Sequence, residues 1–104
     1  KLVVKMRTFK VRKTTVQWNA HPNFLYCIEF DRISYQQAVE DFAEAVSWCW
    51  SAFGDSIDLQ SWQRIKKRAR YNQFWCWDNQ NSVHPNRIYL SSSKEVDAFL
   101  LKWN

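Results

Sequence analysis

The sequence has 104 residues, a formal net charge of +5, one glycine and two prolines. Hydrophobic residues make up 46% of it and aromatic residues 17%, which excludes an intrinsically disordered chain because such chains are poor in aromatic residues. A chain of this length has room for one core, so we expect a single domain over residues 1–104. A single glycine also excludes the glycine-rich loops of P-loop and Rossmann proteins.

The cysteines indicate a reducing compartment. Cys27, Cys49 and Cys76 form an odd set without a CxxC pair, and no signal peptide precedes them, so we expect a cytoplasmic protein without a disulfide framework. Structural zinc sites need two close pairs of ligands, so we expect neither a metal nor another cofactor. Acidic residues interrupt every apolar stretch well short of the roughly 18 residues of a membrane span, so we expect no membrane contact.

Two strands are predicted in the first third of the chain. Residues 1–13 are rich in β-branched residues, and their apolar positions change phase near Thr8, which indicates a strand with a bulge or bend there. Residues 23–30 alternate strictly, which predicts a second, antiparallel strand. One face of this second strand is expected to carry Phe24, Tyr26, Ile28 and Phe30.

A long helix is predicted over residues 35–53. Ser34 and Gln37 have the spacing of a capping box, and Gly54 stands where a left-handed residue ends a helix. At about 100° per residue, the apolar side chains form one stripe, which we expect to face the sheet. The stripe consists of Tyr35, Val39, Phe42, Val46, Cys49 and Phe53.

A second, shorter helix is predicted over residues 59–70, with Asp58 as its cap and a basic outer face. The aromatic run within residues 71–78 and the alternation of residues 87–91 predict two more strands. Ser92 and Glu95 form another capping box, which opens a final helix that ends at Trp103. The expected fold is α+β, in the order β-β-α-α-β-β-α, with an antiparallel sheet of about four strands and two to three helices packed on one face.

The basic run of the second helix is a candidate site for nucleic acid or another anion. Cations neutralise phosphates while exposed rings stack on bases, and this combination is found here. An alternative interpretation is a solvated helix face beside core aromatics. The candidate residues are Arg64, Lys67, Arg68, Arg70, Trp75 and Trp77.

Trp48 is a candidate for protein contact because it falls on the acidic face of the long helix, opposite the apolar stripe. Tryptophan is enriched at the centres of protein interfaces. The alternative is a ring that lies flat against the rest of its own domain. Two copies of the chain could also pair through their acidic and basic faces, as a homodimer.

His21 and His84 each precede Pro-Asn, and acid-base catalysis would need one of them beside a carboxylate. A His-Pro pair is also an ordinary loop dipeptide, and no further catalytic constellation is recognised, so we expect a protein that is not an enzyme.

The ending of the chain resembles small proteins of tailed bacteriophages, including those of marine cyanobacteria. Such proteins close with an aromatic strand, a short turn and an Ala-Phe-x-Leu-(Lys/Arg)-Trp helix. Ala98, Phe99, Leu101, Lys102 and Trp103 stand in those places, and the run from Phe74 to Trp77 resembles the aromatic strand. The resemblance covers about the last third of the chain. It implies an accessory protein encoded by a phage and located in the host cytoplasm.

The expected function is a small binding or accessory module that contacts a protein partner or its own copy. Excess aromatic surface without nearby chemistry motivates this expectation. The alternative is a domain that binds nucleic acid through residues 64–70 and the adjacent rings.

Overall fold

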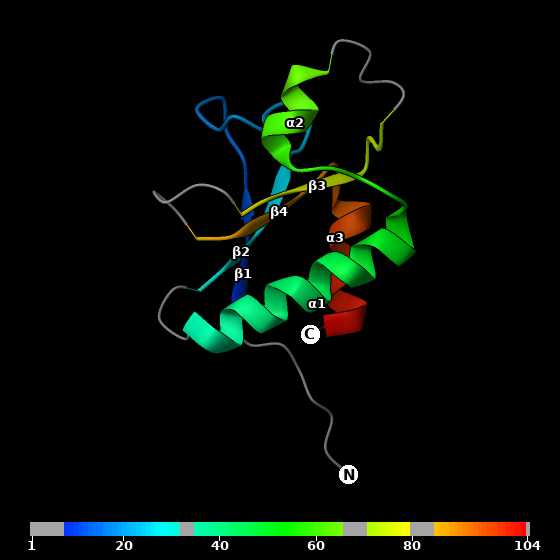
Figure 1. Cartoon of the computed structure of the whole chain (residues 1–104). Coiled ribbons are helices and arrows are strands. Elements are labelled where there is room, and N and C mark those ends of the chain that lie inside the picture. Colours follow the sequence, from blue (N-terminus) through cyan, green and yellow to red (C-terminus); the bar gives the residue numbers. More distant parts are fainter. Residues whose placement is uncertain (1–7, 32–34, 66–70, 80–84, 104) are drawn as a thin grey trace.

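The computed structural model describes residues 8–31, 35–65, 71–79 and 85–103. It confirms the α+β fold and the expected order of elements (Figure 1). The elements are β1 (Phe9–Lys13), β2 (Tyr26–Phe30), α1 (Tyr35–Phe53), α2 (Leu59–Arg64), β3 (Trp75–Asp78), β4 (Arg87–Leu90) and α3 (Ser93–Trp103). Within the described ranges, no helix is both long and apolar enough to cross a membrane.

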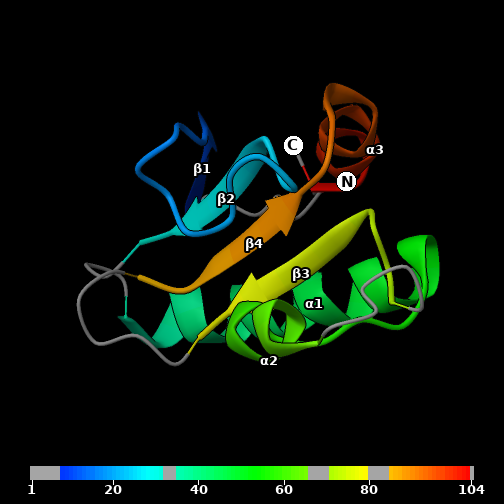
Figure 2. The same cartoon turned by 90° about the horizontal axis from the view of Figure 1, so that it is seen from above.

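The four strands form one antiparallel sheet in the order β1-β2-β4-β3. The last strand in the sequence therefore lies between β2 and β3, as Figure 2 shows. Tyr89 of β4 is paired with Cys27 of β2 on one side and with Cys76 of β3 on the other. Because side chains alternate across a strand, these three residues share one face of the sheet and their neighbours share the other.

One face of the sheet packs against α1 and α3. Ile28, Trp75 and Ile88, one from each of β2, β3 and β4, have no exposed surface. They belong to the larger of two hydrophobic clusters, which α1 and α3 complete with Phe42 and Phe99. Figure 1 shows both helices below the sheet and α2 above it.

The second cluster lies on the other face of the sheet. Leu59 and Trp62 of α2 cover Cys27, Cys76 and Tyr89 there. The loop between β1 and β2 adds two more buried residues, Ala20 and Phe24. The sheet is thus covered on both faces, with two helices on one and a short helix plus a loop on the other.

Phe24 corrects the expected second strand. The strand begins at Tyr26 rather than at residue 23, so the alternation does not extend to Phe24. Its ring lies 4.9 Å from that of Trp62, in the second cluster, and not beside Ile28 and Phe30. The physical reason is that the loop must reverse the chain between β1 and β2, and this reversal carries Phe24 over the opposite face.

The second helix is shorter than expected. It ends at Arg64, and Ile65 has extended backbone angles. A helix continued to residue 70 would carry the chain about 12 Å beyond Trp62 at 1.5 Å per residue. Instead the carbonyl of Asn72 accepts a hydrogen bond of 3.2 Å from Nε1 of Trp62, so the chain has to return to the helix within ten residues.

The predicted end of α1 and the predicted start of α3 are confirmed. Gly54 follows α1 with a φ of 95°, a left-handed conformation that favours glycine. A Cβ at this position would lie 3.2 Å from Nδ2 of Asn72, so the space is also limited. At the start of α3, the Ser92 amide and hydroxyl both donate to Oε1 of Glu95, at 3.1 and 2.6 Å, which stabilises the first turn. Ser34 lies outside the described residues.

Candidate functional site

Trp75 does not lie on the surface. It has no exposed area, and its Nε1 donates a 2.7 Å hydrogen bond to the carbonyl of Gly54. Trp77 is half-buried on the same face of β3. The sequence made both rings candidates for contact with a ligand, but α1 packs against this face. Of the two candidate rings, only Trp77 has surface that a ligand can contact.

Trp48 lies between α1 and α3 and is half-buried. Its ring centre is 5.4 Å from that of Phe53 and 5.9 Å from that of Phe99, in edge-to-face contacts. The structure therefore places Trp48 against its own domain, one of the two alternatives for this residue.

The candidate nucleic-acid residues are described only in part. Arg64 is exposed at the end of α2, while Lys67, Arg68 and Arg70 lie outside the described residues. Because α2 ends before them, a basic face on one continuous helix is wrong. The binding of nucleic acid by this run stays a prediction.

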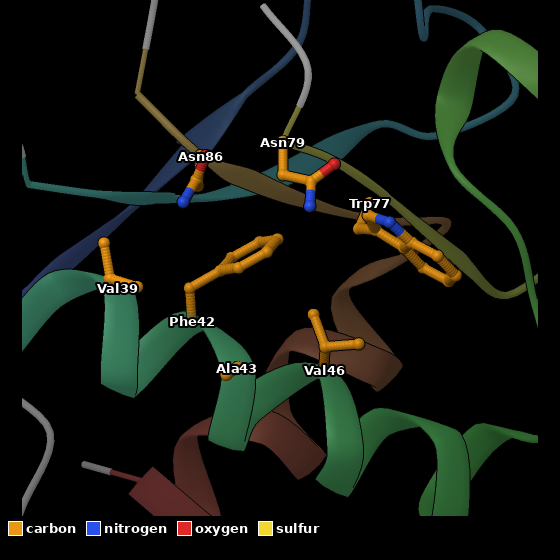
Figure 3. Close-up of a pocket in the computed structure, with 7 residues that line it drawn as sticks. All are labelled: Val39, Phe42, Ala43, Val46, Trp77, Asn79 and Asn86. Carbon is orange, nitrogen blue, oxygen red and sulfur yellow. The ribbon is translucent and has the colours of Figure 1, made fainter.

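An apolar groove runs between α1 and the ends of β3 and β4; we call it the α1 groove (Figure 3). It has a volume of about 610 Å³, within the range of ligand sites. The α1 side of the groove consists of Val39, Phe42, Ala43 and Val46, and the opposite side consists of Trp77, Asn79 and Asn86.

The groove continues along α1 to an exposed tryptophan. Trp50 follows Val39, Ala43 and Val46 at spacings of four, three and four residues, so all four lie along one line of the helix. Val39 is 39% exposed and Trp50 is 42% exposed, which is high for such side chains. The described part of the chain thus leaves an apolar ridge of α1 uncovered.

Three tryptophans form one end of this surface. The ring centre of Trp77 lies 6.0 Å from that of Trp50 and 5.3 Å from that of Trp75. Trp75 is fixed by the core, so it holds Trp77 in place, and Trp77 in turn supports the exposed ring. This arrangement presents a large, rigid apolar area, which loses little side-chain entropy when a ligand covers it.

Asn79 and Asn86 place two amide groups on the strand side of the groove. Figure 3 shows both side chains on the wall opposite α1, with their amides turned toward the ring of Phe42. An amide offers both a hydrogen-bond donor and an acceptor. The α1 groove therefore combines an apolar floor with polar groups at its edge, the usual composition of a binding site.

Sequence analysis missed this site. It placed Val39 and Val46 in the stripe that faces the sheet. Phe42 and Cys49 of that stripe are buried as expected, but Val39 is exposed and Val46 is only half-buried. The signal was present, because Trp50 is apolar and lies in line with Val39, at the edge of the expected stripe. An apolar surface wider than one stripe indicates a second contact.

A buried charge cluster lies on the opposite face of the sheet, around Glu29 of β2. Arg87 donates from Nε and Nη2 to Oε2 of this carboxylate, at 2.9 and 2.8 Å. Arg12 donates from Nη1 to Oε1 at 3.1 Å, and Lys10 Nζ lies 4.0 Å from the same oxygen. Burial by itself would raise the pKa of Glu29, but the hydrogen bonds from Arg87 and Arg12 outweigh it and hold the pKa below its usual value.

This cluster predicts that the free energy of unfolding falls in acid. The pKa of Glu95 is also below its usual value, because hydrogen bonds from Ser92 and Ser91 outweigh its burial. A carboxyl group whose pKa is lowered by folding stabilises the protein above its unfolded pKa, about 4.3 for glutamate, and loses this effect as the pH falls through the folded pKa. We expect stability to be constant from pH 7 to 5 and to fall below about pH 4.

Urea unfolding followed by tryptophan fluorescence at pH 6 and pH 3 measures this difference. The variant Glu95→Gln should show a smaller loss between the two pH values than the wild type. Equal stability at both pH values would contradict the role of the carboxylates.

The cysteines are free and buried on both faces of the sheet. Burial raises the pKa of Cys49 to about 12, and it also raises the pKa values of Cys27 and Cys76. Thiols of this kind stay protonated at neutral pH and are poor nucleophiles. Within the described ranges, no three histidine, cysteine or acidic residues gather in a way that could hold a metal ion.

Of the two histidines, His21 lies in the described part of the chain. Nδ1 of His21 lies 3.5 Å from the hydroxyl of Thr14 in the loop between β1 and β2. His84 lies outside the described residues.

The chain matches no protein-family model, no curated protein and no solved structure. The resemblance of its last third to phage proteins therefore stays a prediction.

Proposed function

We propose that this chain is a small non-enzymatic binding module that holds an apolar helix of a protein partner in the α1 groove. The observation that carries the proposal is the exposed ring of Trp50, 42% exposed and 6.0 Å from Trp77 of the groove. Tryptophan is the residue most enriched among those that dominate binding energy. Two adjacent rings on an uncovered apolar ridge therefore favour a contact surface.

A helix is the segment that fits this surface best. Val39, Ala43, Val46 and Trp50 form a ridge along α1, and the small side chain of Ala43 lowers it at the middle. Ridges of this kind pack into the grooves of a second helix. Amphipathic helices lie in apolar grooves with side chains at three- and four-residue spacings as anchors. The amides of Asn79 and Asn86 would then contact the polar edge of the bound helix.

The buried, protonated thiols support a role without covalent chemistry. They also support the proposal of a reducing compartment such as the cytoplasm, because three unpaired cysteines persist there.

The proposal predicts that binding depends on the exposed ridge. Peptides that bind the wild-type protein are first selected from a library of amphipathic helices. Their affinity should fall about tenfold or more for the variants Val39→Asp and Trp50→Ala, because the loss of a hot-spot side chain costs about 2 kcal/mol. Binding is measured by isothermal titration calorimetry. The matched control is Leu101→Asp, which changes an 89% exposed leucine on α3.

Sedimentation of the protein at micromolar and higher concentrations distinguishes a second copy from another protein as the occupant. If the protein self-associates, and Val39→Asp abolishes this association while Leu101→Asp does not, the groove is the interface of a homodimer. That result would exclude a separate partner helix. Peptides whose affinity is the same for both variants, or a protein that selects none, would overturn the proposal.

A further inference from the structure

A polar cavity lies above the charge cluster, on the face of the sheet opposite the α1 groove. It has a volume of about 310 Å³ and is lined by residues of three strands, the loop between β1 and β2, and α2. The charged and aromatic lining residues are Arg12, Trp18, Asp78, Arg87 and Tyr89. The cavity adjoins the second hydrophobic cluster on this face, and buried carboxylates such as Glu29 and Asp78 are costly to desolvate.

Trp18 provides a planar surface at this cavity. The guanidinium carbon of Arg87 lies 4.4 Å from its ring centre and that of Arg12 lies 5.2 Å away. The edge of Tyr89 packs against the same ring at 6.3 Å. These contacts fix a half-buried indole in place, and fixed aromatic rings and guanidinium planes are the surfaces on which nucleobases stack.

The two ends of the cavity differ in chemistry. At the β1 end, Arg12 lines the cavity with a side chain that is 46% exposed. Lys10, 64% exposed, does not line the cavity but lies beside Arg12, at the same oxygen of Glu29. Arg12 uses Nη1 for Glu29, and its Nε and Nη2 make no hydrogen bond within the described ranges. At the β3 end, the carboxyl group of Asp78 lines the wall. The amide of Asn19 also lines the cavity.

These two ends lie far apart, so a single small ion does not account for both. β1 and β3 are the outer strands, separated by three spacings of about 4.8 Å, or about 14 Å between backbones. A ligand that spans the whole cavity would place an anionic end at Arg12 and the neighbouring Lys10, a planar group on Trp18, and a hydrogen-bond donor within reach of Asp78.

We propose that the polar cavity is a binding site for a purine nucleotide. The phosphate is bound by Arg12 and Lys10, the base stacks on Trp18, and Asp78 accepts hydrogen bonds from the edge of the base. Guanine fits best because its N1–H and its amino group are two adjacent donors that one carboxylate can accept together, whereas the same edge of adenine offers one donor. The same chemistry is offered by a free nucleotide and by a nucleotide within a strand.

The test is isothermal titration calorimetry with guanosine 5′-monophosphate, and with guanosine and inorganic phosphate as its two halves. The mononucleotide should bind about tenfold or more tightly than either half, because both ends of the cavity are then used. Arg12→Gln should weaken binding of the mononucleotide and leave guanosine unchanged. Asp78→Asn should weaken binding of guanosine and leave phosphate unchanged.

Lys13→Gln is the matched control. Lys13 is the next residue on β1 but lies over Tyr26, which belongs to the opposite face of the sheet. Its removal changes the net charge as Arg12→Gln does, so equal effects of the two variants would reduce the interaction to general electrostatics and overturn the proposal. Circular dichroism checks that each variant folds, and Arg12→Gln carries the test because its side chain is half exposed.

Two further outcomes would also overturn the proposal: the absence of mononucleotide binding up to millimolar concentration, and inorganic phosphate that binds as tightly as the mononucleotide.

A short oligonucleotide with a guanosine 5′-phosphate end distinguishes a free nucleotide from a nucleotide within a strand as the natural ligand. Tighter binding of the oligonucleotide assigns the site to a strand, and equal binding assigns it to a free nucleotide. Val39→Asp should bind the mononucleotide like the wild type, which separates this site from the α1 groove.

Discussion

Glu29→Ala is expected to lower the free energy of unfolding by about 3 to 5 kcal/mol, because it leaves a buried guanidinium without its partner. The side chain of Arg87 is only 15% exposed, and two of its nitrogens donate to Glu29. Removal of the carboxylate leaves these donors desolvated and unpaired. The loss of Coulomb attraction for Arg12 and Lys10 adds less, because both are more exposed.

Urea unfolding at pH 7 measures the effect, with Glu44→Ala as the control because Glu44 is exposed on α1. The control should change stability by no more than about 0.5 kcal/mol. A double variant, Glu29→Ala with Arg87→Met, should recover part of the loss, since no buried charge then remains without a partner. If Glu29→Ala and Glu44→Ala have equal effects, the charge cluster does not stabilise the fold.

Trp62→Ala is expected to cost about 3 to 5 kcal/mol, the usual range for a large aromatic residue removed from a core. Trp62 is 2% exposed, packs on Phe24 at 4.9 Å and donates from Nε1 to Asn72. It is the main contact of α2 with the second cluster. Its loss leaves a cavity over that face of the sheet, and α2 is too short to be stable by itself.

Trp50→Ala is the matched control, because it removes the same side chain from an exposed position on α1. It should change the unfolding midpoint in urea far less than Trp62→Ala, while the dependence on urea stays similar in both. Similar losses for the two variants would contradict the division between a structural tryptophan and a contact tryptophan.

The fold was predictable to a large extent because its signals are local. The end of α1 follows from Gly54, and the start of α3 follows from the pair Ser92 and Glu95. All three residues lie within four positions of the boundary that they determine. The prediction failed where a distant residue decides the outcome. Asn72 returns to Trp62 and ends α2 early, and the turn before β2 moves Phe24 to the second cluster.

The candidate sites were less predictable for the same reason. Trp77 was found from its aromatic run, but the burial of Trp75 depends on α1, which packs on β3 from more than twenty positions away. The hydrogen-bond partners of Glu29 are 17 and 58 positions from it, so no sequence window contains the cluster.

The sequence by itself determined the kinds and order of the elements, the fold class and the ends of α1 and α3, since periodicity and capping act over a few residues. Only the tertiary structure decided which face of α1 is buried, which tryptophans stay exposed and which charges meet. These depend on the pairing of β4 between β2 and β3, which brings remote segments together. The α1 groove and the polar cavity both arise from that pairing, on opposite faces of one sheet.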